Sequence, residues 1–100
     1  MVYFEPNNQH DFMYDNQKTI YKLIDEIIWN EWDPIGVNEI PEVRDEYYSY
    51  LPKIFDLKIS GTDRETLAQH LFQIETRNMG LTGDIENCRR IAQRIVEIAL

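Results

Sequence analysis

Apolar residues recur at the spacing of an α-helix in several stretches of this chain, and this periodicity constrains the fold more than any other feature. In the first stretch the apolar side chains fall at relative positions zero, three, four, seven and eight, on one face of a helix: Ile20, Leu23, Ile24, Ile27 and Ile28. No stretch alternates apolar and polar residues for long, so the sequence predicts no β-sheet. Because isoleucine has only moderate helix propensity, packing of this face must stabilise the helix.

Proline and capping residues divide the chain into four helices. The first helix is expected to begin at Asp15 or Asn16, which are good N-caps, and to end before Pro34. The second begins near Pro41, and Pro52 interrupts its pattern, which predicts a kink or a break. We therefore expect an all-α fold, a small four-helix bundle with its second helix kinked or broken at Pro52 and with an irregular N-terminal segment.

Two capping signals mark the remaining helices. Thr62 and Glu65 have the spacing of a capping box, which predicts the start of the third helix at Thr62. Thr82 or Asp84 is expected to cap the fourth helix. Its apolar stripe includes Cys88, at a position that accepts a small buried residue.

The length of the chain, 100 residues, predicts one domain spanning residues 1–100. Apolar residues make up 43% of it, which is enough to build a core and argues against intrinsic disorder. Residues 1–15 lack helical periodicity but are rich in aromatic side chains, so we expect an irregular segment that packs partly on the core.

The formal net charge is −8, and most of it lies in the first sixty residues. Residues 1–60 carry 12 acidic and 5 basic residues, a balance of −7, and residues 61–100 carry 6 and 5, a balance of −1. Nucleic acids and anionic membrane surfaces require basic patches, so neither is expected as a partner. A basic protein suits this charge better. A single cysteine and the absence of a signal peptide or membrane span predict a cytoplasmic protein.

Carboxylates and tyrosines gather around the loop before the second helix. Tyr47, Tyr48 and Tyr50 cannot all face the core, because adjacent positions on a helix point about 100° apart. An exposed tyrosine beside carboxylates is typical of a binding surface, although a solvated acidic face and core tyrosines would also fit. The residues expected to contact a partner are Asp33, Glu39, Glu42, Asp45, Glu46, Tyr47 and Tyr48.

No residue is predicted to be catalytic, to ligate a metal or to hold a cofactor. His10 and His70 belong to no metal-binding motif, and the carboxylates do not follow the spacing of a calcium loop. A small metal-dependent enzyme that combines loop carboxylates with one of these histidines remains an alternative. Another is a self-associating structural subunit, such as a homodimer.

The segment from Glu31 to Val37, with Trp-Asp-Pro-Ile-Gly-Val at its end, is followed by Asp45-Glu46-Tyr47 and Tyr50-Leu51-Pro52. In these motifs the chain resembles a group of small uncharacterised bacterial helical proteins, over about residues 20–81. The resemblance implies that the loop and the second helix form one unit, in which Trp32 anchors the following turn to the core. It implies no activity.

The acidic residues beside paired tyrosines are also similar to those of the four-helix immunity proteins that block nuclease bacteriocins. The matching positions are Asp45, Glu46, Tyr47 and Tyr48. The −7 balance of the first sixty residues and the tyrosine cluster beside the carboxylates lead us to expect a non-catalytic interaction module for a basic partner. An immunity or antitoxin-like inhibitor is the sharpest form of this hypothesis.

Overall fold

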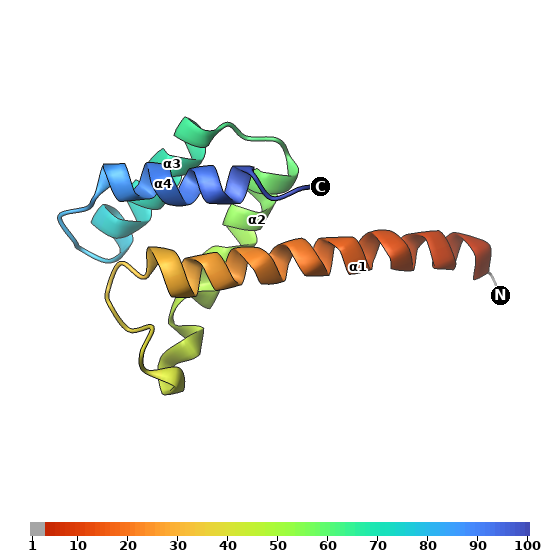
Figure 1. Cartoon of the computed structure of the whole chain (residues 1–100), viewed down its shortest axis with the longest axis horizontal. Helices are drawn as coiled ribbons and strands as arrows, with labels where there is room; N and C mark the ends of the chain where they lie inside the picture. Colours follow the sequence, from red (N-terminus) through yellow and green to blue (C-terminus); the bar gives the residue numbers. More distant parts are fainter. Residues whose placement is uncertain (1–3) are drawn as a thin grey trace.

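The computed structural model describes the backbone of residues 4–100 and the side chains of residues 16–100. Its α-helices are α1 (Phe4–Ile27), α2 (Leu51–Ile59), α3 (Arg64–Gln73) and α4 (Ile85–Val96). No β-strand occurs in residues 4–100, so the predicted all-α fold with four helices is confirmed. α3 and α4 pack closely side by side. α4 runs antiparallel to α1, which lies below α4 in the view of Figure 1.

Shorter helical turns extend or precede the α-helices. A π turn, η1 (Ile28–Trp32), continues α1, and a second, η3 (Ile74–Asn78), continues α3. A 3₁₀ element, η2 (Pro41–Tyr50), leads into α2. The loop before η2 and η2 itself form a lobe on the other side of α1 from α3 and α4 (Figure 1).

The second predicted helix is broken at Pro52, as the sequence indicates. The 3₁₀ element ends at Tyr50, and α2 starts at Leu51 with Pro52 in its first turn. A proline there sacrifices no hydrogen bond, because the first N–H groups of a helix have no partner within it. A second irregularity occurs at Val43, whose φ of −111° and ψ of 28° are not helical.

Two predicted helix starts differ from the structure. α1 begins at Phe4 and not near Asp15 or Asn16. We also expected residues 1–15 to pack on the core, but their side chains lie outside the described part of the structure. α3 is capped by Asp63 and not by Thr62: the Asp63 carboxylate accepts a hydrogen bond from the Thr66 N–H at 2.9 Å. Aspartate is as good an N-cap as threonine, so the capping-box pattern was wrong by one residue.

The start of α4 is as predicted, because the carboxylate of Asp84 accepts a hydrogen bond from the Asn87 N–H at 3.1 Å. Gly80, which follows the C-cap Met79 of η3, has a positive φ of 71°, typical of the position after a helix end.

The core combines the apolar faces of α1, α3 and α4 with residues from η1, η2 and α2. Leu23, expected inside, is instead 42% exposed, because the neighbouring helices cover only the side of α1 that carries Ile20, Ile24 and Ile27. None of the helices in the described part of the chain combines the length and the hydrophobicity needed to cross a membrane. The buried apolar residues are Ile20, Ile24, Ile27, Ile28, Trp29, Trp32, Tyr47, Leu51, Ile54, Leu67, Ala68, Leu71, Ile74, Cys88, Ile91, Ala92 and Ile95.

Candidate protein-binding surface

The loop after η1 is built around Asp33. Its φ of 33° lies in the left-handed region, where aspartate is one of the few side chains commonly found. Its carboxylate accepts hydrogen bonds from the N–H groups of Val37 at 2.8 Å and Asn38 at 3.1 Å. These bonds satisfy the backbone of a turn that has no helical partners, so Asp33 determines the shape of the loop.

Tyr47 joins η2 to this loop. Its hydroxyl donates to the Asp33 carboxylate at 2.7 Å and accepts from the Ile35 N–H at 3.2 Å. Its ring packs against the rings of Trp29 and Trp32, with centroids 6.0 and 5.8 Å away. Burial, and then the hydrogen bond to the Asp33 carboxylate, raise the pKa of Tyr47. Loop and 3₁₀ element therefore form one unit, and we call residues 33–50 the acidic lobe.

Two of the seven residues expected to contact a partner thus have structural roles. Tyr47 is only 2% exposed and belongs to the core. Asp33 is partly buried, with its carboxylate occupied by the turn. The other five lie on the surface of the acidic lobe: Glu39, Glu42, Asp45, Glu46 and Tyr48.

The geometry of η2 decides which side chains face out. A 3₁₀ helix has three residues per turn, so side chains three apart lie above one another. After the irregularity at Val43, Arg44, Tyr47 and Tyr50 form the inward ridge, all buried or partly buried. Asp45 and Tyr48 form an exposed ridge, and Tyr48 is 46% exposed. This arrangement explains why one of the three tyrosines is exposed, as the sequence predicts.

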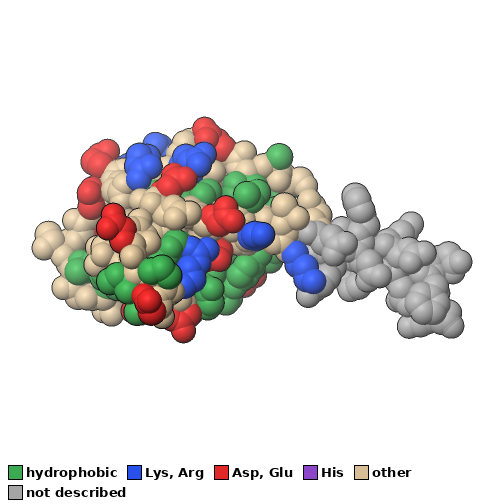
Figure 2. All heavy atoms as spheres, turned by 60° about the horizontal axis from the view of Figure 1, so that its bottom comes forward, with side chains coloured by type: hydrophobic (Ala, Val, Ile, Leu, Met, Phe, Trp, Pro, Cys, Tyr) green, Lys and Arg blue, Asp and Glu red, His purple; other side chains and the backbone are tan. Residues whose placement is uncertain are grey.

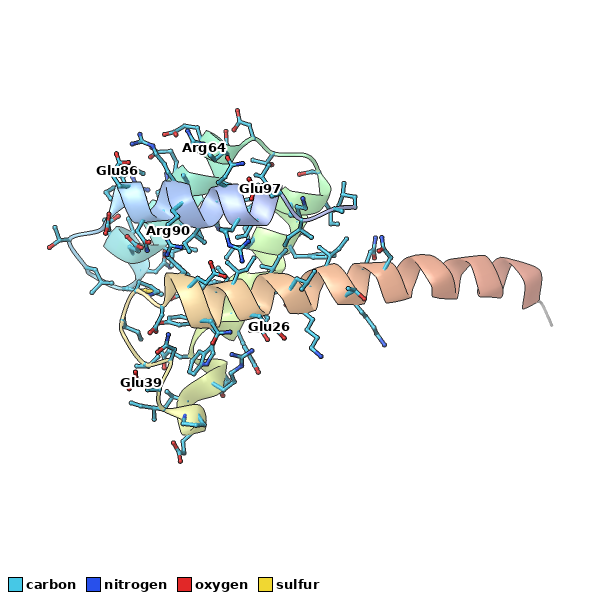
Figure 3. All side chains as sticks on the ribbon, in the orientation of Figure 1. Glu26, Glu39, Arg64, Glu86, Arg90 and Glu97 are labelled. Carbon is cyan, nitrogen blue, oxygen red and sulfur yellow. The ribbon has the colours of Figure 1, made fainter. Side chains whose placement is uncertain are left out.

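Most carboxylates elsewhere on the described surface have a hydrogen-bond or ion-pair partner, and several of them pair with arginine. Glu31 contacts Arg94 at 2.8 Å, and Glu65 contacts Arg89 at 3.1 Å. The hydrogen bond to Arg94 is the main cause that lowers the pKa of Glu31. These arginines belong to α4, and Figure 3 shows Arg90 of the same helix on one side of α1 and Glu39 of the lobe on the other.

The acidic lobe has no such neutralisation. Residues 33–50 carry five acidic residues and one basic residue, a balance of −4. The one base, Arg44, forms an ion pair with Asp25 of α1 at 3.0 Å and lies 5.1 Å from the centre of the Trp29 ring. Among the described residues, no hydrogen bond or ion pair occupies Glu39, Glu42, Asp45 or Glu46. Their charge therefore faces solvent uncompensated.

Two exposed isoleucines belong to the same lobe, and the sequence-based prediction missed them. Ile35 is 38% exposed and Ile40 is 47% exposed, so with Tyr48 the lobe presents three large apolar side chains. Figure 2, which turns the underside of Figure 1 forward, shows hydrophobic side chains gathered there with Asp and Glu side chains around them. The signal available in the sequence was the position of both isoleucines in a loop bracketed by prolines.

The interior contains one carboxylate that no pattern predicted. Glu75, in η3, is 2% exposed, and its two oxygens accept from the Trp32 indole N–H at 2.7 Å and the Asp84 N–H at 2.8 Å. Cys88 lies beside it, and burial together with the Glu75 charge raises the pKa of this thiol to about 12. A thiol with that pKa is not a nucleophile near neutral pH, so this cluster has a structural role.

The described side chains do not form the metal site of the alternative hypothesis. No group of three or more histidine, cysteine or carboxylate side chains within them is placed to hold a metal ion. His70 is partly buried, and burial lowers its pKa. His10 lies outside the described side chains.

Comparison with protein-family models, with curated proteins and with solved structures gives no match for this chain. The geometry of the acidic lobe is therefore the basis of the functional argument that follows.

Proposed function

We propose that this chain is a non-catalytic protein-protein interaction module whose acidic lobe binds a basic protein. An immunity or antitoxin-like inhibitor is the form of this function that we favour. One observation carries the proposal: Glu39, Glu42, Asp45 and Glu46 have no partner in the described structure, although most carboxylates elsewhere on its surface do. The exposed Tyr48 belongs to the same 3₁₀ element as Glu42, Asp45 and Glu46, and tyrosine is common at binding hot spots.

The charge pattern favours one class of partner. Uncompensated carboxylates on one surface attract a cationic protein over about 10 Å at moderate salt and raise its association rate. The same charges repel nucleic acid and anionic membrane surfaces. The lobe is also held rigid by the bonds between Asp33, Tyr47 and Ile35, so little conformational order has to be gained on binding. The buried free thiol of Cys88 is compatible with a reducing compartment, and we place this interaction in the cytoplasm.

The experiment is an affinity pull-down from host lysate, followed by mass spectrometry and then by binding kinetics with each purified candidate. The test variant is Glu42→Gln/Glu46→Gln, which removes two unpaired charges from the lobe. The expected result is a basic protein retained at low salt, with an association rate lowered about tenfold in the variant. At high salt the two proteins should associate at similar rates, because the salt screens the removed charges.

A matched control removes the same number of charges elsewhere. Glu26→Gln/Asp56→Asn changes two exposed carboxylates outside the lobe that also have no hydrogen-bond or ion-pair partner in the described structure. Equal loss of binding in both variants would reduce the effect to net charge and contradict a specific surface. Recovery of the bait alone, with a doubled mass in light scattering, would favour the self-associating alternative.

A further inference from the structure

The three exposed apolar residues of the acidic lobe suggest what the partner must look like, and this inference rests on the function proposed above. Ile35, Ile40 and Tyr48 are between 38% and 47% exposed, and each belongs to the segment that carries the unpaired carboxylates. Scattered exposed apolar residues are ordinary on a protein surface. An apolar group surrounded by polar or charged residues is instead the usual anatomy of a binding interface.

We infer that Ile35, Ile40 and Tyr48 form the apolar centre of the binding surface, and that the carboxylates form its rim. The partner segment that fits it is amphipathic and basic, with an apolar side chain that contacts the isoleucines and lysine or arginine residues on both sides. The rim determines how fast the complex forms, and the apolar centre determines how long it lasts.

The backbone of this centre is fixed before binding. The Ile35 N–H donates to the Tyr47 hydroxyl, and the Ile40 N–H donates to the Val37 carbonyl at 2.9 Å. The Ile40 carbonyl in turn accepts from the Val43 N–H at 3.1 Å. Both isoleucines are therefore held by hydrogen-bonded turns, and their exposure does not depend on a mobile loop.

Charge also argues against a second copy of this chain as the occupant. A symmetric dimer through the lobe would bring the same carboxylates of both copies together. Such like-charge contacts are unfavourable, and Arg44 cannot offset them because it is already bound to Asp25 and the Trp29 ring. A different protein with a basic amphipathic segment meets no such repulsion.

The test uses two synthetic peptides as defined probes. In the first, leucine and lysine are arranged so that a helix has one apolar and one cationic face. In the second, every leucine is replaced by serine, so that the charge is the same and the apolar face is lost. The wild-type chain should bind the first peptide at least about tenfold more tightly than the second. Chemical-shift perturbations in the protein should concentrate in residues 35–48.

Three variants separate the two parts of the surface. Ile40→Ser should raise the dissociation rate of the leucine peptide about tenfold and leave its association rate nearly unchanged. Leu23→Ser is the matched control, because Leu23 is 42% exposed on α1, away from the lobe, and it should bind like the wild type. Glu42→Gln/Glu46→Gln should slow association and weaken its dependence on salt.

The outcomes distinguish the inference from the proposed function. Equal affinity for both peptides, or equal losses in Ile40→Ser and Leu23→Ser, would overturn the apolar centre while leaving a charge-based partner in place. Perturbations centred on the groove that Leu23 and Ile98 line between α1 and α4 would also overturn it. If neither peptide binds but the wild type retains a basic lysate partner with which Glu42→Gln/Glu46→Gln associates more slowly, the function stands and the inference falls. If neither peptide binds and the variant associates with its lysate partner as fast as the wild type, both the inference and the proposed function are wrong.

Discussion

The hydroxyl of Tyr47 connects the two halves of the acidic lobe, and its removal gives the sharpest test of the structure. Tyr47→Phe deletes a hydrogen bond to a charged acceptor, the Asp33 carboxylate at 2.7 Å, and leaves the Ile35 N–H without its acceptor at 3.2 Å. A hydrogen bond to a charged group contributes about 1.5–3 kcal/mol. Water can replace part of the second bond at this partly buried site, so we expect a loss of about 2 kcal/mol in the free energy of unfolding at neutral pH.

The titration of the same hydroxyl determines how the difference in unfolding free energy between the wild type and Tyr47→Phe depends on pH. Burial and the Asp33 carboxylate raise the pKa of Tyr47 above the value of about 10 of an unfolded tyrosine. A raised pKa in the folded state contributes stability that is fully present below pH 10 or so and is lost as the pH rises above it. The wild type should therefore lose about 1.4 kcal/mol of stability per pH unit above about pH 10 through this group, and the phenylalanine variant should not.

Urea unfolding at about pH 7 and about pH 11, followed by far-ultraviolet circular dichroism, measures both effects. The gap between wild type and Tyr47→Phe should narrow by about 1.4 kcal/mol at the higher pH. Tyr48→Phe is the control, and we expect it to match the wild type because that side chain is exposed. A gap that is the same at both pH values would refute the reasoning, since the Tyr47 hydroxyl would then titrate equally in both states.

Three further predictions concern the interior. Glu75→Gln should lower the free energy of unfolding by about 2 kcal/mol in urea titrations. Each oxygen of the buried carboxylate accepts from a different N–H, and in glutamine an NH₂ group replaces one of these oxygens. Unchanged stability would show that Glu75 is not bonded in this way. Gly83→Ala should destabilise the protein more than Gly80→Ala in thermal melts. Both glycines have a positive φ, so alanine is strained at either position. At Gly83 the added Cβ would also lie 2.6 Å from the Phe72 ring, whereas at Gly80 it would meet nothing within 4 Å. Cys88 should resist a thiol-reactive dye at about pH 8 in the folded protein and react after unfolding, since it is buried with its pKa raised to about 12; fast reaction of the native protein would contradict its burial.

Local signals in the sequence predicted most of the fold. The break at Pro52 and the Asp84 cap depend on the backbone chemistry of one or two residues, so they could be placed from the sequence. The cap of α3 shows the limit of this approach. Thr62 and Asp63 are adjacent and both are accepted N-cap residues, and the cap in the structure is Asp63, the stronger of the two types.

The candidate surface was less accessible, because it depends on contacts between segments. The positions of Asp33 and Tyr47 indicated one acidic, tyrosine-rich region but not that the two side chains bond to each other inside it. The exposure of Ile40 follows from the turn that η2 makes, which no periodicity encodes. The burial of Glu75 depends on an indole 43 residues away along the chain.

The two π turns make the core sensitive to a deletion in η1. A π turn is an α-helix with one inserted residue, and η1 and η3 carry the partners of one buried hydrogen bond, Trp32 and Glu75. Deleting one residue from η1 would restore a regular helix and rotate the following side chain by about 100°, away from the carboxylate. The buried Glu75 would then lose an N–H donor. A deletion in η1 is therefore expected to destabilise the core around η3 as well as the end of α1.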